Sequence, residues 1–405
     1  MQQTPISVLY FTSASARGGT EEHMLTLMRG LDRSIFRPRI ACGDTLATLL
    51  APDLPPDVTL ARVNLRRPRD FGGALGLMRV LRRLRVEILH SHLFYSSFFA
   101  SPLGWLAGVP VIVETPHVRE EWRRGWLKSK YVLDRLAGHF VDYYIAVSEA
   151  NARYLRETKK LPHEKIVVIH NGCDLGKFDP SRPAPPGMKA KLGFGANDRV
   201  LVSIGRLEPQ KGHRILLEAL VAVRQEFPAV RLVCVGEGAL RSELESLALG
   251  RGLHDAVRFV GYQNNVGDWL SLGDLTVLSS FYEGLPLVAI ESLAAGRPLV
   301  ATAVDGTPEV VLDRKTGLTV PSGDPARLAG AICELLRDPA LRQRMGLEGR
   351  RWVLENFDEK EQVRKTQELY LRAWEAAQRS AKDVAPVANV AAKESAARSA
   401  GNGHQ

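Results

Sequence analysis

The sequence is poor in cysteine, and the few cysteines present show none of the usual functional spacings. There are four in 405 residues, and no two form a CxxC pair. The N-terminus also lacks the basic stretch and the cleavage site of a secretion signal. A disulfide scaffold and a cysteine-rich metal cluster are therefore not expected, and we predict reduced thiols and a cytoplasmic location.

Long uncharged stretches are also scarce, and one of them needs weighing as a membrane span. Residues 93–113 carry no charged side chain and are long enough to cross a bilayer. They contain Pro102, Gly104, Gly108 and Pro110, which would interrupt a membrane helix. A buried helix followed by a buried strand fits this composition better, so no transmembrane helix is predicted.

Positive charge is in excess, and it is concentrated in the first half of the chain. The net charge is +9; residues 1–175 hold 24 Lys and Arg against 17 Asp and Glu, so this half carries 24 − 17 = +7. An anionic partner is expected, either a phosphate-bearing ligand or an anionic lipid. No nucleic-acid motif accompanies the charge, so we expect no nucleic-acid partner.

Short apolar runs alternate with longer amphipathic stretches, which is typical of parallel sheets joined by helices. The chain is too long for one ordinary core, so two domains are expected. Strands are predicted at residues 6–11, 86–89, 109–113 and 144–147, and after a second start at 199–204, 230–235, 257–260, 275–278 and 298–301. We predict an α/β protein of two Rossmann-like domains, residues 1–175 and 176–355, whose parallel sheets face a cleft.

Two segments differ in composition from these domains. Residues 171–187 are rich in Pro, Gly and Asp, as linkers are. Residues 381–405 are mostly small and polar, with almost no large apolar side chain. Such a segment cannot bury enough surface to offset its ordering entropy, so we predict a disordered tail.

The strongest chemical signal is the segment FYEGLPLVAIE, residues 281–291. Glu283 precedes Gly284, Pro286 stands where a helix should begin, and Glu291 follows about two turns later, near the same helix face. Free amides at the helix start suit an anionic group, and the two carboxylates can accept hydrogen bonds from two hydroxyls of one ligand. Taken singly, either glutamate could instead be a solvated or capping residue.

The second signal is SIGRLEPQKG, residues 203–212, directly after a predicted strand. Gly205 would let a ligand approach the backbone. Arg206 and Lys211 would supply a guanidinium fork and a point charge, a pairing that suits a diphosphate whose charge grows as its bond to a sugar breaks. A basic surface turn is an equally good interpretation of this stretch alone.

Three histidines near strand ends are candidates for chemistry. His117 follows the predicted strand 109–113, and a lone histidine there is more often structural than catalytic. His90 and His92 alternate on a strand end in the manner of metal ligands. No cysteine or carboxylate with ligand spacing joins them, so no metal site is predicted.

Together these segments resemble the donor-site motifs of glycosyltransferase family 4, whose members have the GT-B fold. The resemblance runs from about Ile6 to Trp374. It recurs in the ordered motifs GGTE (18–21), TPH (115–117), VSE (147–149), NG (171–172), VGEG (235–238), FVG (259–261) and TPE (307–309). Several motifs in this order are far more specific than any one alone.

The resemblance implies transfer of a sugar from a nucleoside diphosphate, with retention of configuration and without a cofactor or a metal. The implied catalytic residues are His117 beside the anomeric carbon, Arg206 and Lys211 on the diphosphate, and Glu283 on the sugar hydroxyls, with Glu291 on the ribose. The implied donor-binding residues are Gly18, Gly19, Gly205, Arg206, Lys211, Gly236, Gly261, Tyr262, Glu283, Gly284, Leu285, Pro286, Leu287 and Glu291. A helix at residues 356–380 is expected to return to the N-terminal domain.

Two positions depart from the family pattern, and several rival functions stay open. Asp305 stands where the family usually has the first of two glycines, which puts the local donor-loop geometry in doubt, and Cys173 replaces a small apolar residue. Residues 235–241 offer only GxG, without the third glycine of a dinucleotide fingerprint, which weakens the case for a dehydrogenase. A non-catalytic sugar-nucleotide-binding protein and a phosphorylase-like enzyme remain as alternatives.

The acceptor is expected to be a glycan or a lipid-linked sugar of the cell envelope, such as lipopolysaccharide. Basic residues interleave with aromatic ones between positions 119 and 131, and a second basic cluster spans positions 79–85. Such clusters suit an anionic headgroup layer, so we predict peripheral contact with the inner face of the cytoplasmic membrane. A solvated helix face is an equally good interpretation. The residues are Arg119, Trp122, Arg123, Arg124, Trp126, Lys128, Lys130 and Tyr131, with Arg79, Arg82, Arg83 and Arg85 in the second cluster.

Overall fold

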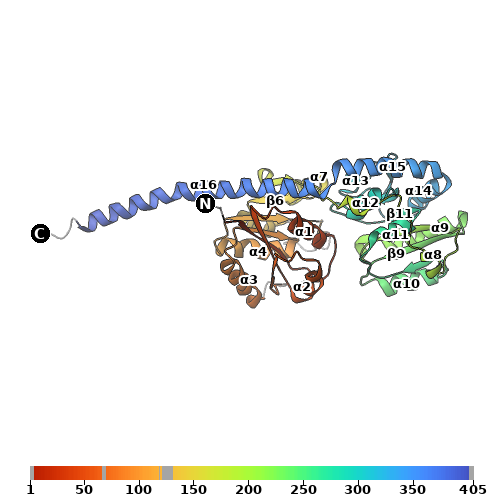
Figure 1. Cartoon of the computed structure of the whole chain (residues 1–405), viewed down its shortest axis with the longest axis horizontal. Helices are drawn as coiled ribbons and strands as arrows, with labels where there is room; N and C mark the ends of the chain where they lie inside the picture. Colours follow the sequence, from red (N-terminus) through yellow and green to blue (C-terminus); the bar gives the residue numbers. More distant parts are fainter. Residues whose placement is uncertain (1–3, 66–69, 118, 121–130, 401–405) are drawn as a thin grey trace.

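The computed structural model describes residues 4–65, 70–117, 119–120 and 131–400. The chain forms two α/β domains that lie side by side, with α15 and α16 running along one side of both (Figure 1). Each domain has one sheet in which every pairing of neighbouring strands is parallel. The predicted α/β class and the two parallel sheets are confirmed.

The N-terminal sheet has seven strands in the order β3-β2-β1-β4-β5-β6-β7. Its inner strand β1 is mostly apolar, and all seven of its residues are buried, as expected for a strand covered by helices on both faces. The strands are β1 (Ile6–Thr12), β2 (Phe36–Cys42), β3 (Thr59–Arg62), β4 (Ile88–His92), β5 (Val111–Thr115), β6 (Tyr143–Ala146) and β7 (Ile166–Val168). Helices α1 (Gly19–Gly30), α2 (Asp44–Leu50), α3 (Phe71–Arg83), α4 (Phe94–Leu106), α6 (Val132–Ala137) and α7 (Glu149–Arg153) join them.

The C-terminal sheet has six strands in the order β10-β9-β8-β11-β12-β13. These are β8 (Arg199–Ile204), β9 (Val230–Val235), β10 (Val257–Phe259), β11 (Leu275–Leu278), β12 (Leu299–Thr302) and β13 (Gly317–Val320). The helices are α8 (Met188–Lys191), α9 (His213–Glu226), α10 (Arg241–Gly250), α11 (Val266–Leu272), α12 (Leu287–Ala294), α13 (Thr307–Val310), α14 (Pro325–Arg337) and α15 (Pro339–Asn356). In both sheets the strand order reverses direction, at β1/β4 and at β8/β11, and ligands of such folds bind beyond the strand ends at this point.

The last two helices begin with strong local signals. Asp338 accepts a hydrogen bond from the backbone N–H of Leu341 and caps α15, which has Pro339 in its first turn. After α15 the chain crosses back as α16 (Glu359–Ala400), and its Val363 and Tyr370 belong to the same apolar cluster as β1 and α1. The C-terminal helix is therefore part of the core of the N-terminal domain.

The end of α16 differs from the sequence expectation. The structure continues this helix through residues 381–400, where a disordered tail was predicted, and residues 401–405 lie outside the described residues. Alanine, lysine, glutamate and arginine are strong helix formers, which accounts for the helical backbone. In Figure 1 this end of α16 extends well beyond the N-terminal domain.

The uncharged stretch at residues 93–113 forms α4 and then β5, as predicted. Pro102 lies inside α4, and all five residues of β5 are buried. Among the residues that the structure describes, no helix is both long enough and apolar enough to cross a membrane.

Candidate active site

The loop after β8 and the loop after β11 meet at a partly buried ion pair. Lys211 ends a short 3-10 turn at Pro209–Lys211, and its Nζ lies 2.6 Å from Glu283 Oε1. The same oxygen accepts a hydrogen bond from Ser280 Oγ at 2.6 Å, and Glu283 is 6% exposed. The structure therefore brings together two predicted catalytic residues that stand 72 positions apart in the sequence.

Arg206 has a different environment from Lys211. It is exposed, and no ion pair of its guanidinium is found within the described ranges. Burial raises the pKa of Glu21, a carboxyl of the other domain, to about 7, and the charge of Arg206 acts against this shift. Arg206 thus faces the junction between the two domains with its charge uncompensated, as a site for an anionic ligand requires.

Three predicted donor-site glycines lie side by side at the ends of β8, β9 and β10. The N–H of Gly236 donates to the carbonyl of Gly261 at 2.8 Å, and the N–H of Gly205 donates to Val235. Gly236 has a φ of +142°, and a Cβ there would lie 2.0 Å from the carbonyl oxygen of Gly205. This close backbone contact explains why a glycine is required, and it keeps the surface at the strand ends free of side chains.

The segment that follows Glu283 leads into α12. Leu285 is buried, and Pro286 is the N-cap of α12, with Leu287 as its first helical residue. The sequence analysis placed Pro286 one residue further in; its ψ of 104° is extended, so the helix begins after it. Glu291 lies half-buried on α12, and desolvation raises the pKa of its carboxyl to about 7.

The two domains touch at Gly284. A Cβ on this residue would lie 1.7 Å from the backbone oxygen of His117, and Ser148 Oγ donates to the carbonyl of Gly284 at 3.0 Å. Nearby, a Cβ on Gly19 would lie 3.6 Å from Leu287 Cδ1, so the Gly18-Gly19 turn of the N-terminal domain faces the start of α12. The donor-site loops therefore face His117 and the glycine turn across the junction.

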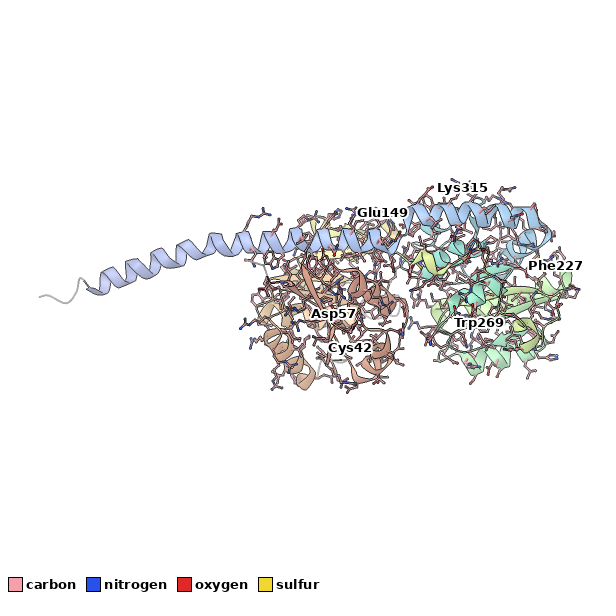
Figure 2. All side chains as sticks on the ribbon, in the orientation of Figure 1. Cys42, Asp57, Glu149, Phe227, Trp269 and Lys315 are labelled. Atoms are coloured by element: carbon pink, nitrogen blue, oxygen red, sulfur yellow. The ribbon has the colours of Figure 1, made fainter. Side chains whose placement is uncertain are left out.

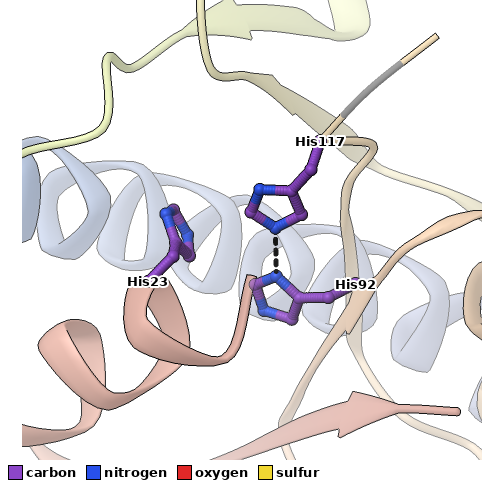
Figure 3. A group of neighbouring side chains, drawn as sticks. All are labelled: His23, His92 and His117. Carbon is purple, nitrogen blue, oxygen red and sulfur yellow. Dashed lines mark hydrogen bonds between the residues drawn. The ribbon is translucent and has the colours of Figure 1, made fainter. Parts of the chain in front are cut away.

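His117 belongs to a cluster of three buried histidines that turn toward one another (Figure 3). His23 comes from α1, His92 ends β4, and His117 follows β5. His117 Nε2 lies 3.0 Å from His92 Nδ1, and the ring centroids of His23 and His117 are 4.8 Å apart. Burial lowers the pKa of His23 to about 4 and the pKa values of His92 and His117 well below the ordinary value, so the imidazoles are neutral near pH 7.

His90, the other histidine of the strand-end pair, hydrogen-bonds to residues outside this cluster. Its Nδ1 lies 2.5 Å from the hydroxyl of Tyr370 on α16, and its Nε2 lies 2.7 Å from Thr115 Oγ1. Both ring nitrogens are thus occupied by neighbouring hydroxyls. His90 joins α16 to the sheet, whereas His92 faces the predicted active site.

Two acidic residues that the sequence analysis did not place in the site connect the domains. Asp305 Oδ2 accepts from the backbone N–H of Glu283 at 2.9 Å, and its other oxygen pairs with Arg119 of the N-terminal domain. Asp305 has a φ of +42°, a conformation that favours glycine, which accounts for the glycine usual there in the family. The departure noted in the sequence is therefore an interdomain contact.

Glu309 makes the second of these contacts. Its carboxylate accepts hydrogen bonds from the backbone N–H groups of Glu149 and Ala150, each at 2.9 Å, and pairs with His170. Figure 2 labels Glu149, which lies where the two domains meet. The TPE and VSE motifs that carried the resemblance are thus joined across the junction, a link that spacing alone does not reveal.

Tyr262, predicted to line the nucleotide base, is 53% exposed. Burial raises the pKa of its hydroxyl, and the charge of Arg17 acts against this shift. Arg17 precedes the glycine turn and forms ion pairs with Glu22 and Asp53. A basic residue next to the Gly18-Gly19 turn is the sequence feature that could have added Arg17 to the candidate site.

The predicted membrane-contact surface can be placed only in part. Residues 121–130, which include both tryptophans and four of the basic residues, lie outside the described residues. Arg79, Arg82 and Arg83 lie on α3, and Arg85 follows that helix. Membrane contact stays a prediction.

Two family models match the chain, one on each domain. The model described as Glycosyltransferase Family 4 matches residues 17–177, and the model described as Glycosyl transferases group 1 matches residues 187–352. The chain belongs to glycosyltransferase family 4. The recognition made from short motifs is confirmed.

Curated relatives of this family 4 member match it over only part of their length. The D-inositol 3-phosphate glycosyltransferase of Thermobispora bispora is 33% identical over 279 residues, which are 63% of this chain and 63% of the relative. The lipopolysaccharide core biosynthesis glycosyltransferase LpsD of Rhizobium meliloti is 38% identical over 186 residues, which are 46% of this chain and 53% of the relative. The match thus spans less than two thirds of either relative.

Similarity to solved structures supports the fold of this family 4 member. The crystal structure of Anabaena Alr3699/HepE in complex with UDP and glucose superposes with a TM-score of 0.79 at 19% identity, covering 91% of this chain and 100% of that chain. Together with the two parallel sheets, this likeness shows that the chain has the predicted GT-B fold.

Proposed function

We propose that the protein is a retaining glycosyltransferase that moves a hexose-type sugar from a nucleoside diphosphate to an acceptor, without a metal cofactor. One observation carries the proposal. The Lys211–Glu283 pair of one domain lies next to Gly284, which touches the backbone of His117 of the other domain. Groups suited to a diphosphate, to sugar hydroxyls and to the reacting carbon are thereby gathered at one point of the junction.

The diphosphate would be bound by charge and by backbone amides. Arg206 offers an uncompensated guanidinium. The backbone N–H groups of Gly284, Leu285 and Leu287 precede and begin α12, where a partial positive charge favours anions. Lys211 is paired with Glu283, so a sugar hydroxyl that hydrogen-bonds to Glu283 would also lie close to the positive charge of Lys211. Such preorganised groups stabilise the charge that develops on a leaving diphosphate.

The proposed reaction is a displacement on one face of the sugar ring. The bond between the anomeric carbon and the diphosphate oxygen breaks, and its electron pair stays on that oxygen. The acceptor oxygen bonds to the anomeric carbon on the same face, and its proton passes to the departing diphosphate. The products are a glycoside with retained configuration and a free nucleoside diphosphate.

Substrates are suggested by the chemistry of relatives and neighbours. The Anabaena protein is described with UDP and glucose, which favours a UDP-linked hexose as the first donor to try. The Rhizobium relative is named for lipopolysaccharide core biosynthesis, which favours an acceptor in envelope glycan, lipopolysaccharide or glycolipid. We infer that the enzyme works at the inner face of the cytoplasmic membrane, where such acceptors are assembled.

The test is a transfer assay with nucleotide-linked hexoses in the presence of EDTA. Release of the nucleoside diphosphate should continue at full rate, because side chains and amides rather than Mg²⁺ meet the phosphate charge. Loss of release on chelation, followed by rescue with Mg²⁺, would refute metal independence. A glycoside of inverted configuration would refute the same-face mechanism.

A further inference from the structure

The three histidines around His117 are arranged in a way that the proposed reaction does not require. His23, His92 and His117 come from three separate elements, and each offers a ring nitrogen within 4.8 Å of the others. Their ring centroids are 4.8 Å apart for His23 and His117, 5.3 Å for His92 and His117, and 5.4 Å for His23 and His92. The imidazoles thus surround one point from three directions (Figure 3).

Two nitrogens of this cluster are buried without a hydrogen-bond partner, the Nε2 atoms of His23 and His92. The opposite nitrogen of His23 is occupied, since its Nδ1 lies 2.8 Å from Asn171 Oδ1 and 2.8 Å from Gln362 Nε2. The opposite nitrogen of His92 contacts His117. Buried polar atoms left unpaired are costly, and two in one cluster point to a missing ligand.

We propose that His23, His92 and His117 form a binding site for a late first-row divalent cation, for which Zn²⁺ is the probe. Neutral imidazole is a ligand that such cations prefer, whereas Mg²⁺ and Ca²⁺ require oxygen ligands. Zn–N bonds of about 2.0–2.1 Å would require the three rings to adjust, since their ligand nitrogens lie within 4.8 Å of one another here. Three protein ligands leave the fourth tetrahedral position for water.

The surroundings of the cluster support a metal site. In the tautomer that leaves Nε2 free for a metal, His23 Nδ1 donates to Asn171 Oδ1, as ligand histidines do to outer-shell residues, and Gln362 lies against the same nitrogen. Gln362 is itself fixed, because its Oε1 accepts from the backbone N–H of Gly172 at 2.6 Å.

Occupation of this site should inhibit the enzyme, a consequence that rests on the proposed function. A cation on His117 would place a charge and a bound water beside the position proposed for the anomeric carbon. It would also fix the His117 ring, which lies next to the contact between Gly284 and the His117 backbone. The site would therefore respond to Zn²⁺ as an inhibitor, while catalysis itself remains independent of metal.

The direct test is a titration of the EDTA-treated, desalted full chain with Zn²⁺ in the absence of any donor. The proposal predicts binding of one equivalent at this site. His23→Asn and His92→Asn should each abolish it, and Asn171→Leu should weaken it about tenfold through the outer shell. His254→Asn, an exposed histidine in the other domain, should leave it unchanged.

A spectroscopic measurement on the unaltered protein covers the case in which the histidine variants fail to fold. Co²⁺ bound in this site should show tetrahedral d–d bands without thiolate charge-transfer absorption. Thiolate absorption would show that a cysteine holds the metal and would overturn the proposal. A Zn²⁺ affinity unchanged from that of the wild-type protein in folded His23→Asn or His92→Asn variants would overturn it as well.

The activity measurement separates this inference from the proposed function. Transfer should fall as Zn²⁺ fills the site, with half-inhibition at the dissociation constant from the titration, and EDTA should restore it. Full activity with the site occupied would refute the inhibitory role. If the metal-free enzyme transferred no sugar, the proposed function would fail, whereas the titration would still decide whether the site exists.

Discussion

Arg206 and Lys211 stand five positions apart but lie in different electrostatic surroundings. Lys211 is 2.6 Å from the carboxylate of Glu283, whereas Arg206 is exposed and has no ion pair within the described ranges. An incoming diphosphate would therefore meet Arg206 as a free charge and Lys211 as a charge shared with a carboxylate. Both side chains would stabilise the diphosphate most strongly as negative charge grows on it during its departure.

We predict that Arg206→Ala and Lys211→Ala each lower kcat/KM by an amount equivalent to about 2–4 kcal/mol, the loss found for comparable electrostatic groups. Steady-state kinetics with the best donor measures this. Thermal melts serve as the control, since Arg206 is exposed and its removal leaves the fold intact. Wild-type turnover in either variant would show that the diphosphate lies elsewhere.

Replacing Glu283 by alanine should impair a different property of the enzyme from replacing Glu291 by alanine. Glu283 lies beside Lys211 and the interdomain contact, so its loss should reduce discrimination among sugars. Glu291 lies on α12 and is assigned to the ribose, so its loss should weaken binding of the bare nucleoside diphosphate. Calorimetric titration with the nucleoside diphosphate measures the affinity of each variant. A larger loss of affinity in Glu283→Ala than in Glu291→Ala would reverse the assignment.

The pKa of Glu291 adds a dependence on pH. Burial raises this pKa from 4.5 to about 7, so between these values the folded protein keeps a proton that the unfolded chain has lost. The free energy of unfolding therefore falls as pH rises through that window. Above pH 7 the folded protein bears the full free-energy cost of a desolvated, ionised Glu291. Glu291→Gln should raise the Tm of the unliganded protein at pH 8 relative to wild type and change it little at pH 4. Equal melting at pH 8 would contradict the buried carboxylate.

Single residues also mark the limit of what the sequence could predict. The roles predicted for Glu283 and Lys211 come from motifs, and the structure places the two side chains together. Asp305 was noticed only as a departure, because nothing in the sequence shows that its carboxylate reaches Arg119 of the other domain. The His92–His117 contact was missed for the same reason, since spacing along a chain does not report which strand ends become neighbours.

At the scale of elements, the tight approach at Gly284 leads to a sharp prediction. Gly284→Ala would place a methyl group within 1.7 Å of the His117 carbonyl oxygen, so the two domains could not meet as they do here. A displacement of about 1 Å between reacting groups can cost about 100-fold in rate, and we expect a loss of kcat/KM of that order. Steady-state kinetics measures it.

Gly330→Ala is the matched control for this prediction. Gly330 lies in α14, and a Cβ there meets no atom within 4 Å outside its own helix. This variant should keep full activity and gain up to about 1 kcal/mol of stability from helix propensity. Full activity in Gly284→Ala would show that the domains need not meet at this point during turnover.

Strands that are continuous apolar runs could be predicted from the sequence. The bounds of β8, β9 and β11 agree with the expectation, since buried parallel strands are marked by a predominance of apolar residues. Missed were β2, β3, β7 and β13. Pro38 within β2 argues against an inner strand, and β7 spans only three residues. The local sequence therefore favours loops at these places. The strands form because neighbouring strands of the sheet supply their hydrogen bonds.

At the scale of the whole molecule, the basic excess of residues 1–175 lies on the domain that would carry the acceptor. α3 ends with Arg82 and Arg83, and Arg85 follows it. We predict that the protein co-sediments with anionic vesicles at low salt, because each basic residue near such a surface contributes about 1 kcal/mol. Binding should fall as salt is raised.

The control for this prediction is a variant in which Trp122, Arg123, Arg124 and Trp126 are all replaced by serine. It should bind anionic vesicles less well, and neutral vesicles should not bind the wild-type protein. If wild-type protein stays in the supernatant with anionic vesicles at low salt, membrane contact is refuted and an acceptor free in solution becomes the better hypothesis.

The central claim is that the junction between the two domains binds a nucleoside diphosphate without metal. Thermal melting with UDP, GDP and ADP in EDTA tests it most directly, since a ligand that binds only the folded protein at 100 times its Kd adds about 2.7 kcal/mol of stability. At least one of the three should raise the Tm of the wild-type protein, and Arg206→Ala should lose most of that rise. No rise with any of them, or an equal rise in Arg206→Ala, would contradict the account.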